Sequence, residues 1–238
     1  MRLRVWVIAH RGASAVAPES TAAALRAAVG AGADMIEVDV QLTRDGRAVL
    51  FHDERMERTT DGCGRLDRLR YREVVRLDAG TWFAPRFAGQ RVLLASQALR
   101  LMPRSMRVNV ELKRTAHPRV LLARLSRVLA APAARSRVLL SSFVPSLLRP
   151  WQRRGWATAL ICDRDAGGSL TRAARLGCVA WHPQERLATP ARIARAHAAG
   201  LRVHPWVVDD PARARQLIRC GVDGFFTNDP GRLRRALR

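Results

Sequence analysis

Short apolar runs alternate along the chain with stretches whose apolar residues recur at helical spacing. The runs have the length of strands, and most of the stretches that follow them are rich in alanine and arginine. Strands are predicted at residues 4–10, 35–42, 106–113, 137–142, 157–162, 178–182, 201–208 and 222–228. Because alternating strands and helices form parallel units, eight such strands favour a closed TIM (β/α)₈ barrel over an open sheet.

Helices are predicted between these strands, for example at residues 20–31, 118–131, 190–199 and 211–219. Pro190 and Pro211 each follow a Thr or Asp cap and suit the first turn of a helix. Residues 53–94, rich in Gly, Asp, Arg and aromatic residues, are too long for a simple connection and are interpreted as a functional insertion. No low-complexity linker interrupts the pattern, so a single domain is predicted over residues 1–238.

The composition indicates a soluble globular protein. Apolar residues make up 48% of the chain, yet no stretch approaches the ~20 apolar residues of a membrane span, so no transmembrane segment is predicted. The first ten residues lack a small-residue cleavage site and are not interpreted as a signal peptide. The four cysteines form no C-x-x-C pair, which argues against a zinc knuckle or redox dithiol and fits a cytoplasmic protein.

Charge is the unusual property of this sequence. The chain has 42 basic and 20 acidic residues, a formal net charge of +22, and Lys113 is the only lysine. A positive field of this size attracts phosphates of any kind, on a small substrate, a nucleic acid or an anionic lipid. Non-specific binding of polyanions is therefore expected, but the charge alone does not choose the partner.

Polar residues collect where the predicted strands end, which is where barrel enzymes build their active sites. The first strand ends in His10 and Arg11, and the short apolar run 48–51 leads into His52. Imidazole takes either role in proton transfer near neutral pH, so the two histidines are candidates for a general acid and a general base. The remaining histidines have no comparable setting and are left out of the chemistry. His182 is the strongest of them.

Three carboxylates accompany these histidines. Side chains alternate along a strand, so Glu37 and Asp39 share one face, and Glu111 shares a face with Lys113. Carboxylates that converge at a barrel mouth repel one another unless a cation lies between them, and such oxygen ligands suit Mg²⁺ or Ca²⁺. Arg11 and Lys113 would then face an anion beside the metal. The alternative is that these charges pair as salt bridges within the barrel.

Several stretches resemble the glycerophosphodiester phosphodiesterases over essentially the whole chain, most closely the small cytosolic bacterial type. They read AHRGASAVAPESTAAAL, MIEVDVQLTRDGRAVLFHDERMERTTDGCGRL, NVELK, LLSSF and GVDGFFTNDP. The resemblance implies that the insertion covers the barrel mouth and helps to select the glycerol end of the substrate. It also assigns the candidate site: His10 and His52 as the acid–base pair, Glu37, Asp39 and Glu111 as ligands of one divalent ion, and Arg11 and Lys113 as phosphate ligands.

Two motifs depart from the family pattern. The usual Pro-Glu-Asn-Thr is here Pro-Glu-Ser-Thr, in which Glu19 is a candidate substrate contact and Ser20 is expected to cap the following helix. The usual Trp-Thr-Val-Asn is here Trp-Val-Val-Asp, ending at Asp209, so the shape around the glycerol is expected to differ. Trp206 either stacks against glycerol carbons or fills the top of the barrel.

The function predicted from this resemblance is metal-dependent hydrolysis of a glycerophosphodiester to sn-glycerol 3-phosphate and an alcohol. By resemblance, His10 is the base and His52 the acid. One rival is a phosphodiesterase that acts on lysophospholipids at membranes. Another is an arginine-rich nucleic-acid-binding protein on a barrel scaffold, but no nucleic-acid-binding motif accompanies the charge, so no specific nucleic acid is expected. The oligomeric state is left open.

Overall fold

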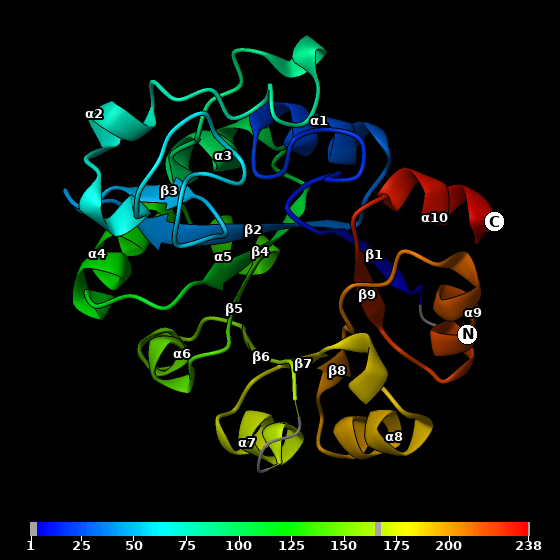
Figure 1. The fold of residues 1–238 in the computed structure, drawn as a ribbon. Coiled ribbons are helices and arrows are strands. Elements are labelled where there is room, and N and C mark those ends of the chain that lie inside the picture. The colour runs from blue at the N-terminus through cyan, green and yellow to red at the C-terminus, as the bar shows by residue number, and fades with distance from the viewer. Residues whose placement is uncertain (1–3, 165–167, 238) are drawn as a thin grey trace.

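Strands form the inside of the structure, and helices surround them (Figure 1). The structure is a computed structural model that describes residues 4–164 and 168–237. Its strands are β1 (Trp6–Ala9), β2 (Met35–Leu42), β3 (Ala48–Leu50), β4 (Arg107–Leu112), β5 (Val138–Ser142), β6 (Thr158–Cys162), β7 (Ala180–Pro183), β8 (Arg202–Val203) and β9 (Gly224–Thr227).

The strands build the predicted barrel. Parallel neighbours follow the order β8-β7-β6-β5-β4-β2-β1-β9, and β3 lies antiparallel against β2. The two ends of this series meet through backbone hydrogen bonds, in which the N–H groups of Asp223 and Phe226 donate to the carbonyls of Val203 and Pro205 at 3.1 and 2.9 Å. The result is a nearly closed parallel TIM barrel, as the alternation of strands and helices predicts.

The strand predicted at residues 201–208 is regular only at β8. Pro205 has no N–H group and therefore interrupts the ladder. The N–H groups of His204 and Trp206 still donate to the carbonyls of Trp181 and Pro183 in β7, at 3.0 and 2.9 Å. The segment thus follows β7 beyond the point where the regular strand ends.

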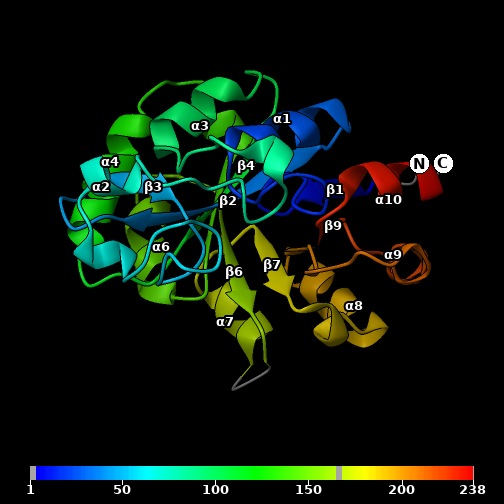
Figure 2. The same cartoon turned by 45° about the horizontal axis from the view of Figure 1, so that its top comes forward.

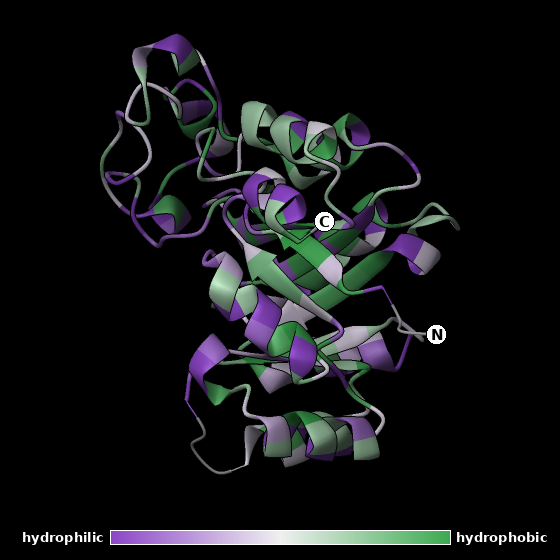
Figure 3. Cartoon of the chain, turned by 90° about the vertical axis from the view of Figure 1, so that its right-hand side faces the viewer, coloured by the Kyte–Doolittle hydropathy of each residue, from purple (hydrophilic) through white to green (hydrophobic). Residues whose placement is uncertain are grey.

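The helices pack on the outside of the barrel, where Figure 3 shows hydrophilic residues on the helices and hydrophobic residues along the strands. Thr189 and Asp210 cap α8 (Pro190–Ala198) and α9 (Pro211–Arg219), each followed by the proline predicted for the first turn. The longer helices are α1 (Ala22–Gly30), α3 (Ala95–Leu101), α4 (Pro118–Val128), α6 (Pro145–Gln152), α7 (Ser169–Arg175), α8 (Pro190–Ala198), α9 (Pro211–Arg219) and α10 (Pro230–Ala236); two short elements are α5 (Ala134–Arg137) and the 3₁₀ turn η3 (Glu185–Leu187).

The cap of α1 corrects one prediction. Thr21, not Ser20, is the N-cap, and its hydroxyl accepts a hydrogen bond from the N–H of Ala24 at 3.4 Å. Ser20 has a φ of 60°, in the left-handed region, whereas an N-cap residue requires an extended backbone. Its N–H donates to the carbonyl of Arg11 at 3.0 Å, so Ser20 instead belongs to the turn that supports Arg11.

The barrel interior changes from apolar to polar along several of the strands. Inward residues near the beginning of the strands form an apolar cluster of Ile8, Met35, Leu139, Ala159, Ala180 and Phe226. Two residues further along the same faces, the buried inward residues include Glu37, Asn109, Ser141 and His182. Since side chains alternate along a strand, this change places the polar groups together above an apolar floor.

The insertion at residues 53–94 is mostly irregular and contains η1 (Leu66–Arg68), α2 (Tyr71–Val74) and η2 (Pro85–Phe87). It lies beside β3 in both views (Figures 1 and 2). Its own apolar cluster includes Met56, Leu66 and Val74, which pack with Val49 of β3. The segment is therefore a packed part of the fold at the end of β2.

Gly12 and Gly30 offer a matched test of the turn after β1. Gly12 has a φ of 83°, and an added Cβ would lie 2.7 Å from the backbone of Ala24, whereas a Cβ at Gly30 would meet nothing within 4 Å. We expect Gly12→Ala to lower the free energy of unfolding by about 1–3 kcal/mol because of overpacking. Gly30→Ala, in a helix, is expected to raise it by about 0.5–1 kcal/mol. Urea unfolding of both variants measures the difference, and equal stabilities would contradict the close packing of this turn.

Candidate active site

The predicted site residues come together at the carboxyl ends of β1, β2 and β4. A cavity of about 100 Å³ is lined by His10, Arg11, Glu37, His52, Asn109, Glu111, Phe143, Ile161, His182, Trp206 and Phe226. Asp39 and Lys113 lie next to its charged side, since both form ion pairs with lining residues. The cavity therefore has a charged wall and an apolar wall.

The charged wall contains three carboxylates. Oxygen atoms of Glu37, Asp39 and Glu111 all lie within 4.8 Å of one another. Glu37 and Asp39 are 2% and 1% exposed, and Oε1 of Glu37 is buried without a hydrogen-bond partner. Burial, followed by repulsion from its neighbours, raises the pKa of Glu37 well above its ordinary value and that of Glu111 to about 7. Crowded carboxylates, with one oxygen of Glu37 left unpartnered, are a donor set that fits a divalent cation.

Two basic side chains partly balance these charges. Arg11 Nε lies 3.3 Å from Asp39 Oδ2, and Lys113 Nζ lies 2.8 Å from Glu111 Oε1 and 3.3 Å from Asp39 Oδ1. The N–H of Arg11 also donates to Glu37 Oε2 at 2.8 Å. Both cations retain further N–H donors, so they can hold an anion without leaving the carboxylates.

Both predicted histidines have one ring nitrogen bound by an oxygen. His10 Nδ1 lies 2.8 Å from Asn228 Oδ1, and His52 Nδ1 lies 2.6 Å from Asp53 Oδ1. An amide oxygen and a carboxylate only accept, so each Nδ1 carries the proton and Nε2 is left for the cavity. Burial and the charge of Arg11 lower the pKa of His10 to about 4, and burial lowers the pKa of His52. His10 is thus neutral at pH 7.

Gln41 holds the loop that carries His52, a role that the sequence analysis missed. Its Nε2 lies within 3.0 Å of the carbonyl oxygens of Phe51, His52 and Asp53. Its position could have been inferred, because Gln41 continues the alternation that begins with Glu37 and Asp39.

Arg58, in the insertion, binds both Glu19 and Asp53. The sequence analysis did not predict this role. Its guanidinium donates to both carboxylate oxygens of Glu19, at 2.8 and 2.9 Å, and to both oxygens of Asp53. Glu19 Oε1 is in turn 2.9 Å from Arg11 Nη1. Burial alone would raise the pKa values of Glu19 and Asp53, but Arg58 and Arg11 lower the pKa of Glu19, and Arg58 and His52 lower that of Asp53 to about 2. Arg58 therefore holds the carboxylates that orient Arg11 and His52.

The apolar wall contains Trp206, whose ring packs edge-on against Phe143 at 5.7 Å. Its indole N–H donates to the carbonyl of His182 at 3.0 Å, which fixes the ring at the cavity. His182, which the sequence analysis left out of the chemistry, also lines the cavity and lies 3.1 Å from buried His204. Burial lowers the pKa of both imidazoles, so the pair is neutral.

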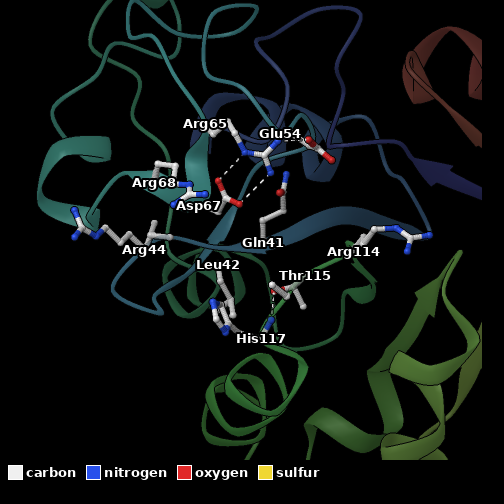
Figure 4. A pocket seen from close by; sticks show the side chains of 12 residues that line it. Gln41, Leu42, Arg44, Glu54, Arg65, Asp67, Arg68, Arg114, Thr115 and His117 are labelled. Carbon is white, nitrogen blue, oxygen red and sulfur yellow. Dashed lines mark hydrogen bonds and ion pairs between the residues drawn. The ribbon is translucent and has the colours of Figure 1, made fainter.

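A larger groove of about 650 Å³ lies beside this cavity, between the insertion and the start of α4. Gln41 lines this groove (Figure 4), and its side-chain amide also donates to the carbonyl of His52 at 2.9 Å. Arg65 is paired with Glu54 and Asp67, while Arg44 and Arg114 extend in opposite directions. Carboxylates therefore neutralise Arg65, and Arg44 and Arg114 do not point toward one another.

Comparison with known proteins decides the family. The profile of the glycerophosphoryl diester phosphodiesterase family matches residues 10–232. The chain belongs to this family. It is a glycerophosphodiester phosphodiesterase, and the resemblance inferred from its motifs is confirmed.

Relatives match this phosphodiesterase over nearly its full length. A glycerophosphodiester phosphodiesterase of Caldanaerobacter subterraneus is 33% identical over 233 residues, 96% of each chain. Among solved structures, an Oleispira antarctica phosphodiesterase in complex with the product sn-glycerol-3-phosphate has a TM-score of 0.92 at 28% identity, covering 99% of this chain and 97% of that one. A glycerophosphodiester phosphodiesterase of Agrobacterium tumefaciens has a TM-score of 0.84 at 27% identity, covering 99% and 100%.

Among the described residues of this chain, every helix is too short or too polar to cross a bilayer.

Because Arg58 holds residues of the site, we expect its substitution to lower activity even though Arg58 does not line the cavity. Arg58→Ala is expected to lower kcat/KM at least about tenfold, because small displacements of positioned groups cost this much or more. Arg55→Ala is the matched control, since Arg55 is an insertion arginine that pairs with Glu57 at the surface. Steady-state kinetics on glycerophosphocholine would compare the two, and equal rates would contradict a role for Arg58 in orienting the site.

Proposed function

We propose that this enzyme hydrolyses glycerophosphodiesters to sn-glycerol 3-phosphate and an alcohol, with one divalent cation, Mg²⁺ or Ca²⁺, and with His10 and His52 in proton transfer. The observation that carries the proposal is that two carboxylates of the cluster, Glu37 and Glu111, line the same cavity as both histidines. The product-bound relative from Oleispira antarctica supports sn-glycerol 3-phosphate as the product. Residues 1–238 act, in this proposal, as one catalytic domain, and a cytoplasmic location remains a prediction.

Glu37, Asp39 and Glu111 would hold the cation. When bound, it supplies charge that polarises a phosphoryl oxygen. Arg11 and Lys113 bind the same phosphate from the side of the carboxylates, and their positive charges stabilise the negative charge that builds up on its oxygens. Trp206 and Phe143 give the glycerol carbons an apolar surface.

The histidines move two protons in opposite directions. His10 Nε2 takes the proton from the attacking oxygen as that oxygen forms its bond to phosphorus. The bond from phosphorus to the alcohol oxygen breaks, and His52 Nε2 donates a proton to the departing alkoxide. Asp53 supports the protonated form of His52 because its carboxylate lies directly on Nδ1. The attacking oxygen belongs either to water or to the glycerol 2-hydroxyl, and only the second route forms a cyclic phosphate, which ³¹P NMR of the reaction mixture would detect.

Cation dependence gives the direct test of this function. The enzyme should release glycerol 3-phosphate from glycerophosphocholine and glycerophosphoethanolamine, lose this activity in EDTA, and regain it when Mg²⁺ or Ca²⁺ is added back. Lysophosphatidylcholine vesicles, assayed in parallel, test the membrane alternative. Faster turnover of the vesicles than of either soluble diester, or full activity in EDTA, would refute the proposal.

Leaving-group chemistry separates the roles of the histidines. His10→Ala and His52→Ala should each lower kcat by about 10²–10⁴-fold on glycerophosphocholine. In a p-nitrophenyl diester the leaving group, p-nitrophenolate, departs without being protonated. This substrate should therefore restore turnover to His52→Ala but not to His10→Ala. Rescue of both variants, or of His10→Ala alone, would show that the acid and base are wrongly assigned.

A further inference from the structure

His10 lies at the end of a chain of polar contacts whose other members are Asn228 and Asp209. The backbone pairing of β1 with β9 sets Ala9 beside Thr227, and the N–H of His10 donates to the carbonyl of Thr227 at 2.9 Å. His10 and Asn228 are therefore neighbours on the inner face of the barrel, which brings the imidazole Nδ1 to 2.8 Å from the amide oxygen.

The orientation of the Asn228 amide is fixed from its other side. Asn228 Nδ2 donates to Asp209 Oδ2 at 2.7 Å, and a carboxylate accepts but does not donate. The amide oxygen must therefore face His10, where the hydroxyl of Ser14 also donates to it, at 2.9 Å. Because this oxygen only accepts, the proton of the neutral imidazole is held on Nδ1.

The carboxylate of Asp209 is itself fixed by neighbouring donors. Its Oδ1 accepts from the N–H of Asn228 at 2.7 Å and from the hydroxyl of Thr227 at 2.8 Å. One of these donors is backbone and cannot reverse. Position 209 must therefore supply two acceptor oxygens, one for the backbone N–H of Asn228 and one for its side-chain NH₂. An asparagine at this position would supply only one.

We propose that Asp209 and Asn228 are positioning residues that hold His10 in the tautomer with its proton on Nδ1, so that Nε2 presents a lone pair to the nucleophile. The catalytic consequence rests on the proposed role of His10 as the base. Asp209, where the chain departs from the family pattern, lies against Asn228. The Asn228 amide lies between the negative charge of Asp209 and His10, whereas the carboxylate of Asp53 contacts the ring of His52 directly.

The decisive variant is Asp209→Asn. The backbone N–H of Asn228 would claim the single amide oxygen at position 209, which leaves an NH₂ group facing the NH₂ of Asn228. The Asn228 amide would then rotate and present a donor to His10 Nδ1, moving the imidazole proton to Nε2. We expect kcat to fall at least about 100-fold with little change in KM, since the wrong tautomer cannot accept a proton at Nε2.

A second variant restores the original polarity by exchanging the two residues. In the double variant Asp209→Asn/Asn228→Asp, the amide NH₂ at position 209 faces a carboxylate at position 228, and that carboxylate accepts from His10 Nδ1. The Nδ1–H tautomer and most of the activity should return. Asp210→Asn is the matched control, because Asp210 loses the same charge but only caps α9.

Two-bond ¹H–¹⁵N correlation spectra of ¹⁵N-histidine-labelled protein, assigned with His10→Ala, read the tautomer directly, and thermal melts check the fold. The proposal predicts Nδ1–H in the wild type, Asp210→Asn and the double variant, and Nε2–H in Asp209→Asn. If Asp209→Asn folds and its His10 keeps the proton on Nδ1, the proposal is overturned. If Asp209→Asn does not fold, the double variant decides, and a proton on Nε2 of its His10 overturns the proposal. A changed tautomer with unchanged turnover supports the positioning role and instead refutes His10 as the base.

Discussion

Mutual repulsion among three buried carboxylates is the constraint on which the rest of this site depends. Glu37, Asp39 and Glu111 come from two adjacent strands, and the pairing of Asp39 with Glu111 in the register of β2 and β4 makes their proximity a property of the barrel itself. Arg11 and Lys113 reduce the repulsion but leave Oε1 of Glu37 without a partner. Such an arrangement costs stability in the absence of a ligand and favours binding of a cation.

The groups around this cluster are held in place by residues that do not line the cavity. Arg58 of the insertion fixes the carboxylates beside Arg11 and His52, and Gln41 fixes the loop of His52. His10 and His52 differ in the charge of their partners, a neutral amide and a carboxylate, although both rings expose the same nitrogen. The carboxylate of Asp53 favours the protonated form of His52 and so opposes part of the effect of burial, which lowers the pKa of this imidazole.

The sequence predicts the parts of this structure that follow from local periodicity. Strand alternation places Glu37, Asp39, Glu111 and Lys113 on inward faces, and the proline-containing caps place the starts of α8 and α9. The contacts of Arg58 with Glu19 and of Asn228 with His10 were missed because they join residues 39 and 218 positions apart. The cap of α1 was misassigned because the left-handed backbone of Ser20 depends on its bond to the turn at Arg11. No periodic pattern reports such contacts.

The central claim, that repelling carboxylates create a cation site, is tested most directly by calorimetric titration of the metal-free protein with Mg²⁺ and Ca²⁺. Glu37→Gln keeps the shape of the side chain and its acceptor for the N–H of Arg11, but removes one charge. The account predicts one cation per wild-type chain, at least about tenfold weaker binding by the variant, and a melting temperature for the variant in EDTA that equals or exceeds that of the wild type. Equal cation binding by the two proteins, or a variant that is less stable than the wild type in EDTA, would contradict it.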